Sequence, residues 1–441
     1  MSPVDAVKGA AGRAATGART AVNRTFRSLY VRNYRLYFVG QGVSMAGSWM
    51  QSVAQAWLIL QLTGSGLALG LTTALQFGPI LVLGPWGGVL ADRRDKRRLL
   101  IATQSAFAAL ALAMGLLTVT GVVEPWMVYA LAGCLGLVTS VDNPARQSFV
   151  IEMVGREDLP NAISLNSVLL NGARVVGPAV AGVLIATVGT GLCFLINAAS
   201  YVAVIVALGM MRAVDLHVAE RAARAKGQLR EGLRYVARNP GLRRPLLLML
   251  AVGALGFNFA TLLPLFATGS LHAGAGGYGA LFSLMGVGAV AGGLAVAFRG
   301  RVTNRMLVAS AAGFGASLAL LGVMPDLKLA LLAMLPCGVA NTVFISTSNS
   351  LLQEHAAPSM RGRVMALFGV VFLGTTPIGA PLAGWVAESL GPRAALALAG
   401  LAVMSAAIAT AVAFRRASRT RTALGGATEP LRALDPAPQE S

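Results

Sequence analysis

The sequence predicts an all-α integral membrane protein, with twelve transmembrane helices arranged in two pseudo-symmetric six-helix bundles. Of its 441 residues 56% are hydrophobic and 12% are charged, and the mean hydropathy of +0.68 is too high for a soluble globular chain. Apolar runs of about 20 residues, each long enough to cross ~30 Å of hydrocarbon, recur along the chain. Short sequences of the first half also recur in the second. Composition, the spacing of the apolar runs and the repeat together predict this fold class.

The apolar runs place twelve membrane helices in order along the chain. They cover residues 35–62, 67–91, 99–120, 126–149, 164–188, 191–212, 243–268, 276–298, 305–324, 328–350, 364–389 and 392–414. The longest polar interval separates the sixth helix from the seventh. The chain therefore divides into a basic N-terminal arm, a first bundle, a linker, a second bundle and a tail, at residues 1–34, 35–212, 213–242, 243–414 and 415–441.

The second bundle repeats the first. Gly177-Pro-Ala-Val-Ala-Gly182 matches Gly379-Ala-Pro-Leu-Ala-Gly384 at an offset of 202 residues. Arg98-Leu-Leu-Ile-Ala likewise matches Arg305-Met-Leu-Val-Ala at an offset of 207. Parallel repeats of this kind are typical of secondary transporters. The copies are not interchangeable, because Asp92 aligns with Arg299.

The basic residues are distributed very unevenly. A net charge of +19 would suggest a nucleic-acid partner in a soluble protein. If both termini face the cytoplasm, however, 33 of the 36 Lys and Arg fall in cytoplasmic segments. That asymmetry follows the positive-inside rule and provides contacts with anionic membrane lipids, so no nucleic-acid partner is expected. The excess of Arg over Lys favours a GC-rich bacterium, and hence a multi-pass monomer in the plasma (inner) membrane. The arm and the tail are then cytoplasmic, the arm being either an interfacial helix or disordered.

A densely charged loop joins the second helix to the third. By charge alone it is compatible with an ordinary solvated loop. Its spacing, Gly-x-Leu-Ala-Asp-Arg, two residues and then Lys-Arg, resembles motif A of the major facilitator superfamily, in the form found in the branch of enterobactin exporters and macrolide efflux proteins. Asp95 stands where that family usually has glycine. The resemblance implies alternating access between the bundles, with a substrate site near mid-membrane. It further implies a cytoplasmic gate, in which the motif acid points toward Arg363, formed by Gly88, Asp92, Arg93, Lys96 and Arg97.

The first bundle contains two candidate groups for charge coupling. Asp142 is set back within an apolar run, where ionisable residues often mark ion pathways. Arg146 lies one helical turn later, so the two residues could instead form a local salt bridge at a helix end. Arg174 in the fifth helix lies at about the same depth, and we predict that it pairs with Asp142. The alternative is that Arg174 extends to the inner surface. Asp142, Arg146 and Arg174 are the predicted proton and charge-coupling residues.

Small residues in the fifth helix predict a close approach of two backbones. Gly177, Pro178 and Gly182 have the spacing for such packing, and Pro178 loosens the helix. The run resembles motif C of drug-proton antiporters in the same superfamily. Ala173 and Ala181 replace two of that motif's glycines.

Polar side chains along the first helix predict either a water-filled cavity or hydrogen bonds between helices, because a glutamine facing lipid would remain unpaired. Asparagines in later helices add further candidates. The predicted cavity residues are Gln41, Ser48, Gln51, Gln55, Asn171, Asn258 and Asn341.

The sequence contains no Walker loop, no pair of His at metal-binding spacing and no Gly-x-Ser-x-Gly motif. We therefore expect no enzyme, no catalytic residue, no metal and no cofactor, with the proton gradient as the energy source. The predicted function is a proton-coupled exporter of amphipathic small molecules, such as drugs or siderophore-like metabolites. An importer of a neutral solute is the first alternative, and a membrane receptor that transports nothing is the second.

Overall fold

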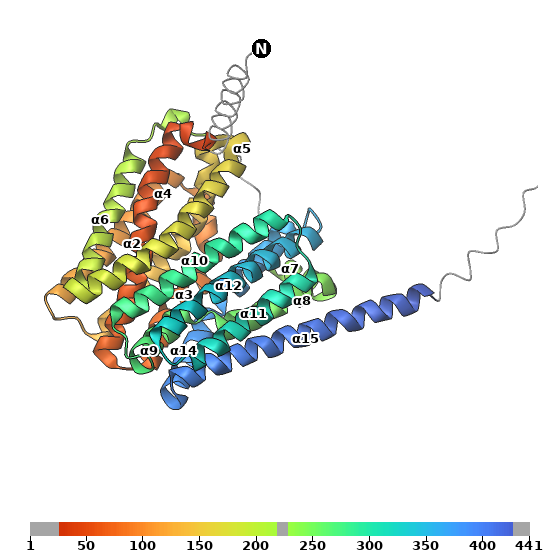
Figure 1. Cartoon of the computed structure of the whole chain (residues 1–441). Helices are drawn as coiled ribbons and strands as arrows, with labels where there is room; N and C mark the ends of the chain where they lie inside the picture. Colours follow the sequence, from red (N-terminus) through yellow and green to blue (C-terminus); the bar gives the residue numbers. More distant parts are fainter. Residues whose placement is uncertain (1–25, 218–227, 427–441) are drawn as a thin grey trace, which may run out of the picture.

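The computed structural model describes residues 26–217 and 228–426, which form long helices and no strand. The helices make two bundles that lie against each other, and the second bundle follows the first in the chain (Figure 1). This agrees with the predicted all-α membrane fold. Most of the basic arm and part of the tail lie outside the described residues, so both alternatives for the arm stay open.

The first bundle is built from five helical segments after a short 3₁₀ turn. The turn is η1 (Arg27–Tyr30), and the five segments are α2 (Arg32–Thr63), α3 (Gly66–Arg93), α4 (Lys96–Val119), α5 (Pro125–Val188) and α6 (Thr190–Gly209). α5 has 64 residues and contains two of the predicted membrane helices. Its backbone leaves helical geometry at Gly155, where φ is 72°, a value that glycine adopts without the strain a side chain would add.

The second bundle follows a 3₁₀ turn and a short helix in the linker. The segments are η2 (Ala213–Asp215), α7 (Gln228–Arg238), α8 (Pro240–Gly256), α9 (Phe259–Gly269), α10 (Ala275–Arg299), α11 (Asn304–Val323), α12 (Leu327–His355), α13 (Arg361–Gly374), α14 (Thr376–Leu390) and α15 (Pro392–Gly426). α8 and α9 together occupy the predicted seventh helix, broken at Phe257 and Asn258. α13 and α14 together occupy the eleventh, broken at Thr375.

Ten of the described segments are long and apolar enough to cross a membrane. α5 counts once among them although it contains two predicted crossings, and α2, whose polar side chains lower its hydropathy, is not among them. The count of twelve therefore stays a prediction.

The bundles touch through a close approach of α5 and α10. A Cβ atom added at Gly279 would lie 2.6 Å from the carbonyl oxygen of Pro178, and one added at Gly182 would lie 3.2 Å from the Cα of Gly279. A side chain at Gly279 would clash with the α5 backbone, so this crossing requires glycine there. The motif C-like run therefore lies at the contact between the two bundles.

A second close approach, between α3 and α14, involves the repeated copy of that run. A Cβ at Gly70 would lie 2.5 Å from the carbonyl oxygen of Ala380, and one at Gly66 would lie 2.7 Å from that of Gly384. Gly384 is the repeat counterpart of Gly182. The two crossings are thus related by the internal repeat, as expected for pseudo-symmetric bundles.

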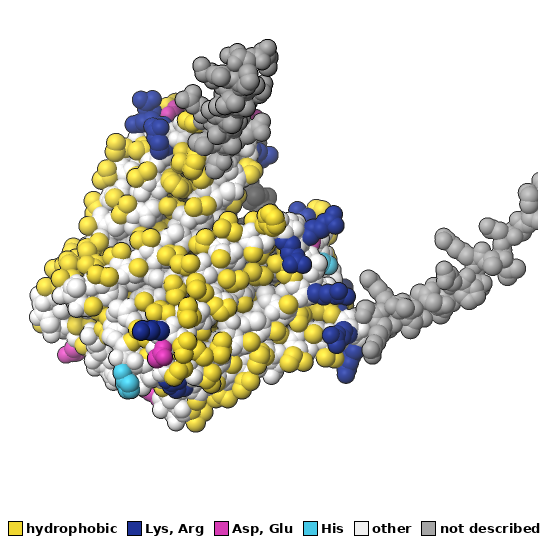
Figure 2. Space-filling view, in the orientation of Figure 1, with side chains coloured by type: hydrophobic (Ala, Val, Ile, Leu, Met, Phe, Trp, Pro, Cys, Tyr) yellow, Lys and Arg dark blue, Asp and Glu magenta, His cyan; other side chains and the backbone are white. Residues whose placement is uncertain are grey.

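These contacts lie near one end of the helices. α3 begins at Gly66 and ends at Arg93, and α10 begins at Ala275 and ends at Arg299, so the contacts lie near the ends opposite these arginines. The bundles meet at the lower left of Figure 1, and their other ends point up and to the right. Most Lys and Arg side chains in Figure 2 gather at those two separated ends. We call these the basic ends of the bundles.

Candidate functional site

A central cavity of about 510 Å³ lies mostly within the first bundle. Its wall combines residues of α2, α3, α4, α5 and α6, and residues of the second bundle close one side. The second bundle contributes Ala260, Tyr278 and Phe282. Because both bundles line it, a rocking motion of one against the other would change its shape and access.

Three of the polar residues that were predicted on α2 line this cavity. Ser48, Gln51 and Gln55 are at the wall. The Ser48 and Tyr201 hydroxyls lie 3.1 Å apart, and the Gln51 Oε1 atom accepts a hydrogen bond of 2.6 Å from Asn197 Nδ2. The predicted alternatives are therefore both present, since these side chains face the cavity and also join α2 to α6.

The other four predicted cavity residues are not at its wall. Asn171 donates a hydrogen bond of 2.8 Å to the Ser167 carbonyl of its own helix. Asn258 and Asn341 are buried in the second bundle, and their Oδ1 atoms have no hydrogen-bond partner among the described residues. Gln41 is buried close to Arg146. The prediction that these four line the cavity is wrong for the cavity described here, because polar residues in helices also serve packing and helix breaks.

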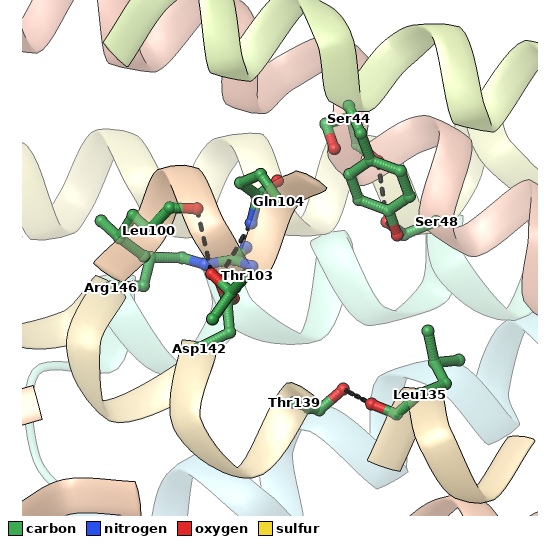
Figure 3. Close-up of polar contacts among 10 residues, drawn as sticks. Ser44, Ser48, Leu100, Thr103, Gln104, Leu135, Thr139, Asp142 and Arg146 are labelled. Atoms are coloured by element: carbon green, nitrogen blue, oxygen red, sulfur yellow. Dashed lines mark hydrogen bonds and ion pairs between the residues drawn. The ribbon is translucent and has the colours of Figure 1, made fainter. Parts of the chain in front are cut away.

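A buried ion pair forms one wall of the cavity. Arg146 pairs with Asp142, whose side chain is only 1% exposed. The same carboxylate accepts hydrogen bonds from Thr103 Oγ1 at 2.7 Å and from Gln104 Nε2 at 2.9 Å (Figure 3). These donors offset the free-energy cost of burying the charge. Thr103 and Gln104 were not predicted, because their partner belongs to a different helix.

Arg146 is held from a second side. With its amide oxygen turned toward Arg146, the assignment that satisfies the hydrogen bonds, Gln41 accepts at 2.6 Å from Nη1 and at 3.2 Å from Nε. The guanidinium is partly exposed and lines the cavity. It therefore combines fixed partners in the protein with access to a ligand.

The predicted pair between Asp142 and Arg174 is wrong. Asp142 pairs with Arg146, which follows it by four residues on the same helical face, and Pro144 does not interrupt the helix between them. Arg174 lies instead over the Trp49 ring, with the guanidinium carbon 5.3 Å from the ring centroid. The similar depth predicted for Asp142 and Arg174 did not bring them into contact, because the two parts of α5 turn these side chains toward different neighbours.

The charged loop joins α3, α4, α5 and α6 at the basic end. Asp95 caps α4 by accepting a hydrogen bond of 2.7 Å from the Arg98 amide, which explains an acid where the family usually has glycine. Arg97 donates from Nε and Nη2 to the Leu208 and Gly209 carbonyls, each at 2.7 Å, at the end of α6. A cation there satisfies the last carbonyls of a helix.

The remaining gate residues lie in the same region. Lys96 forms an ion pair with Glu152 of α5. Gly88 is buried near the end of α3, and Arg93 is the last residue of that helix. The gate role predicted for these residues and for Asp92 stays a prediction.

Arg363, the expected target of Asp92, pairs with the linker. Its Nη1 atom lies 2.5 Å from Glu231 Oε1 of α7, and the Tyr235 hydroxyl of α7 accepts a hydrogen bond of 3.1 Å from the Ala357 amide. The sequence predicts a plain connector at residues 213–242, whereas residues 228–238 of that segment form α7. The helical spacing of Leu229, Leu233 and Val236 could have indicated it.

A family model and several curated relatives match most of this chain, and all of the relatives named here are transporters. The model of a major facilitator family described as transmembrane secretion effector matches residues 24–430. The staphyloferrin A transporter of Staphylococcus aureus is 24% identical over 84% of this chain and 93% of its own length. Macrolide efflux protein A of Streptococcus pyogenes is 24% identical over 85% and 95%. Multidrug efflux pump Tap of Mycolicibacterium fortuitum is 26% identical over 79% and 88%.

Solved structures share the fold. The nucleoside transporter NupG superposes with a TM-score of 0.70 at 13% identity, covering 88% of this chain and 99% of its own. A bacterial homologue of the human lysosomal transporter Spinster, in an inward-facing conformation, gives 0.65 at 14% identity, with 88% and 95% covered. At such identities the likeness concerns the fold alone.

Proposed function

The chain belongs to the transmembrane secretion effector family of the major facilitator superfamily, and from this premise we propose that it is a proton-coupled exporter of amphipathic small molecules. It is a multi-pass secondary transporter, like its relatives. The proposal places it in the bacterial plasma membrane with the basic ends of both bundles in the cytoplasm, because 33 of 36 Lys and Arg then lie on that side.

The observation that carries the proposal is the buried pair of Asp142 and Arg146 in the cavity wall. An ionised Asp142 neutralises Arg146 and closes the site electrostatically. A proton bound by Asp142 removes the negative charge and leaves the Arg146 cation available to the cavity. Proton binding would thereby change the charge that the cavity wall presents to the substrate, which would couple the binding of the two.

The cavity wall supports an amphipathic substrate. Trp49, Tyr278 and Phe282 provide aromatic surface, while Gln51 and Ser48 provide polar groups. Pockets of this mixed character bind ligands with an apolar body and a few polar contacts. The names of the relatives mention staphyloferrin A and macrolides. Drugs or siderophore-like metabolites are accordingly the proposed substrate class.

Transport would proceed by alternating access. The bundles touch at the ends opposite the basic ends, which supports a conformation open toward the basic side. Rocking about the two glycine crossings would close that side and open the other. Asp92 at the end of α3 and Arg363 at the start of α13 would meet in the closed form.

The test uses purified protein in liposomes with an imposed pH gradient and three fluorescent amphipathic dyes, one cationic, one neutral and one anionic. We expect uphill movement of at least one dye, driven by the gradient and abolished by a protonophore. Absence of any gradient-dependent flux, or net movement only in the direction of import, would contradict the proposal.

Asp142→Asn tests the proton role. We expect the variant to lose gradient-driven transport, because an amide does not carry the proton. The double variant Asp142→Asn with Arg146→Gln should lose it as well while removing the unpaired arginine. Asp326→Asn is the matched control, since Asp326 caps α12 by accepting 2.9 Å from Leu329 and Asn caps equally well. Gradient-driven export retained in Asp142→Asn would remove Asp142 from the mechanism.

A further inference from the structure

Arg174 is a cation about midway along the second part of α5, between Gly155 and Val188. None of the described residues gives it a hydrogen bond or an ion pair. Its Nε atom is fully buried without a partner, whereas the side chain as a whole keeps some accessible surface. An uncompensated charge at this depth is strongly unfavourable in a membrane protein and is usually kept for function.

The surroundings of Arg174 place it beside the central cavity. The guanidinium lies over Trp49, which lines the cavity and packs against Phe282 with ring centroids 5.9 Å apart. The backbone at Arg174 also packs against α10, since a Cβ added at Gly286 would lie 3.0 Å from the Arg174 carbonyl oxygen. Arg174 thus sits where α2, α5 and α10 meet, at the contact between the two bundles.

The charges near the cavity do not balance. The acidic and basic side chains in its wall are Asp142 and Arg146, and these neutralise each other. Arg174 adds one positive charge that no described acid pairs with. A bound anion would therefore neutralise the remaining positive charge at this site.

We propose that Arg174 binds an anionic group, a carboxylate or a phosphate, of the transported amphiphile, whose apolar part rests on Trp49, Tyr278 and Phe282. This assignment rests on the proposed transport function and narrows its substrate class. The face of the guanidinium is used by the indole ring, and no described residue accepts a hydrogen bond from its N–H groups, which can donate the two parallel hydrogen bonds that such anions accept. Because the site lies between the bundles, an anion bound there contacts both and favours their closure.

The test measures binding to the full chain in nanodiscs of neutral phosphatidylcholine. The probes are dansylglycine, which carries a carboxylate, and dansylglycinamide, its neutral counterpart, and energy transfer from tryptophan reports binding. We expect dansylglycine to bind about tenfold more tightly or better, the effect of one charge-assisted contact. Arg174→Gln should abolish the preference, and Arg174→Lys, which keeps the charge but cannot form the two parallel hydrogen bonds, should keep only part of it. Arg301→Gln, an exposed arginine in the loop after α10, should leave it unchanged.

Equal affinity for the two probes, binding of neither, or a preference that survives Arg174→Gln would overturn the assignment. Nanodiscs containing phosphatidylglycerol separate the two sources of an anion. If anionic lipid abolishes the wild-type preference for dansylglycine, Arg174 binds a lipid headgroup and the substrate assignment fails. A preference that persists in those nanodiscs supports the substrate assignment.

Thermal unfolding distinguishes a binding role from a structural one. We expect Arg174→Gln to raise the unfolding temperature of the unliganded protein, because the substitution removes an uncompensated buried charge. A lowered unfolding temperature would assign Arg174 to the structure and overturn the proposal. Gradient-driven flux of any of the three dyes by the wild-type protein in liposomes decides the proposed function independently of both results.

Discussion

At the scale of single residues, the first bundle handles two buried arginines in opposite ways. Arg146 has a carboxylate partner on its own helix and an amide partner on α2. Arg174 lies over the face of an indole ring and has no carboxylate partner among the described residues. The first arrangement is internally neutral, and in the proposed mechanism a proton on Asp142 would end that neutrality. The second carries a standing charge that a ligand can satisfy.

The buried pair should show strong non-additivity in stability. Asp142→Asn or Arg146→Gln alone leaves one buried charge without its partner, and each should cost about 3–5 kcal/mol. The double variant removes both charges, so its loss should be clearly smaller than the sum of the single losses. Thermal unfolding of the four proteins in one nanodisc preparation measures this coupling. Additive losses would mean that the pair contributes no interaction energy.

At the scale of elements, the sequence predicted the helices well and their interruptions poorly. The predicted sixth helix, 191–212, compares with Thr190–Gly209 in the structure, because a long apolar run has few other solutions in a membrane. The breaks at Asn258 and Thr375 were missed, since single polar residues inside apolar runs also occur in unbroken helices. α7 was missed because it owes its placement to contacts with α13, which lies far away in the sequence.

For the candidate site, the sequence predicted residues that share one helical face but not the contacts between different helices. Ser48, Gln51 and Gln55 follow from helical periodicity, which fixes which residues share a face. The partner of Asp142 did not follow, because the rotation of one helix about its axis relative to another is set by packing. Tyr201 and Phe282 reach the cavity from α6 and α10, and no local pattern in the chain marks them as lining residues.

The glycine crossing of α5 and α10 gives a prediction at this scale. Gly279→Ala would place a methyl group 2.6 Å from the Pro178 carbonyl oxygen, so the helices must separate, at a cost of about 1–3 kcal/mol. Gly133→Ala is the matched control in α5, because its added Cβ meets nothing within 4 Å and alanine favours the helix. Thermal unfolding should therefore fall for the first variant and stay level or rise for the second. Equal behaviour would mean that the crossing is not tightly packed.

At the scale of the whole molecule, two bundles with related sequences meet through two related crossings and surround one cavity. The crossings of α5 with α10 and of α3 with α14 lie on the same side of the molecule, opposite the basic ends. Because the tight backbone crossings lie toward one end, the basic ends can move by a rocking motion with little change inside each bundle. The charged loop strengthens this behaviour, because Arg97 and Lys96 tie α4 to α6 and α5 within one bundle.

Rocking predicts opposite distance changes at the two ends. Spin labels at Glu157 and Ser359, exposed residues near the basic ends of the two bundles, should move closer when the transporter binds its substrate. Labels at Thr120 and Asp326, near the opposite ends, should move apart. Double electron–electron resonance spectroscopy in nanodiscs, with dansylglycine as the ligand, measures the distance between the labels of each pair. Arg174→Gln should abolish the shift caused by dansylglycine, because the ligand can shift the equilibrium only by binding one conformation better than the other.

The same labels test the gate. If Asp92 and Arg363 meet when the basic ends close, Asp92→Asn should reduce the population with short distances between Glu157 and Ser359 and lower transport, while membrane insertion stays normal. Glu231→Gln should act in the opposite direction, because Glu231 pairs with Arg363 in the conformation described here, and its loss frees that arginine. Distances that change in parallel at both ends, or that respond to neither substitution, would mean that the bundles do not rock about the glycine crossings.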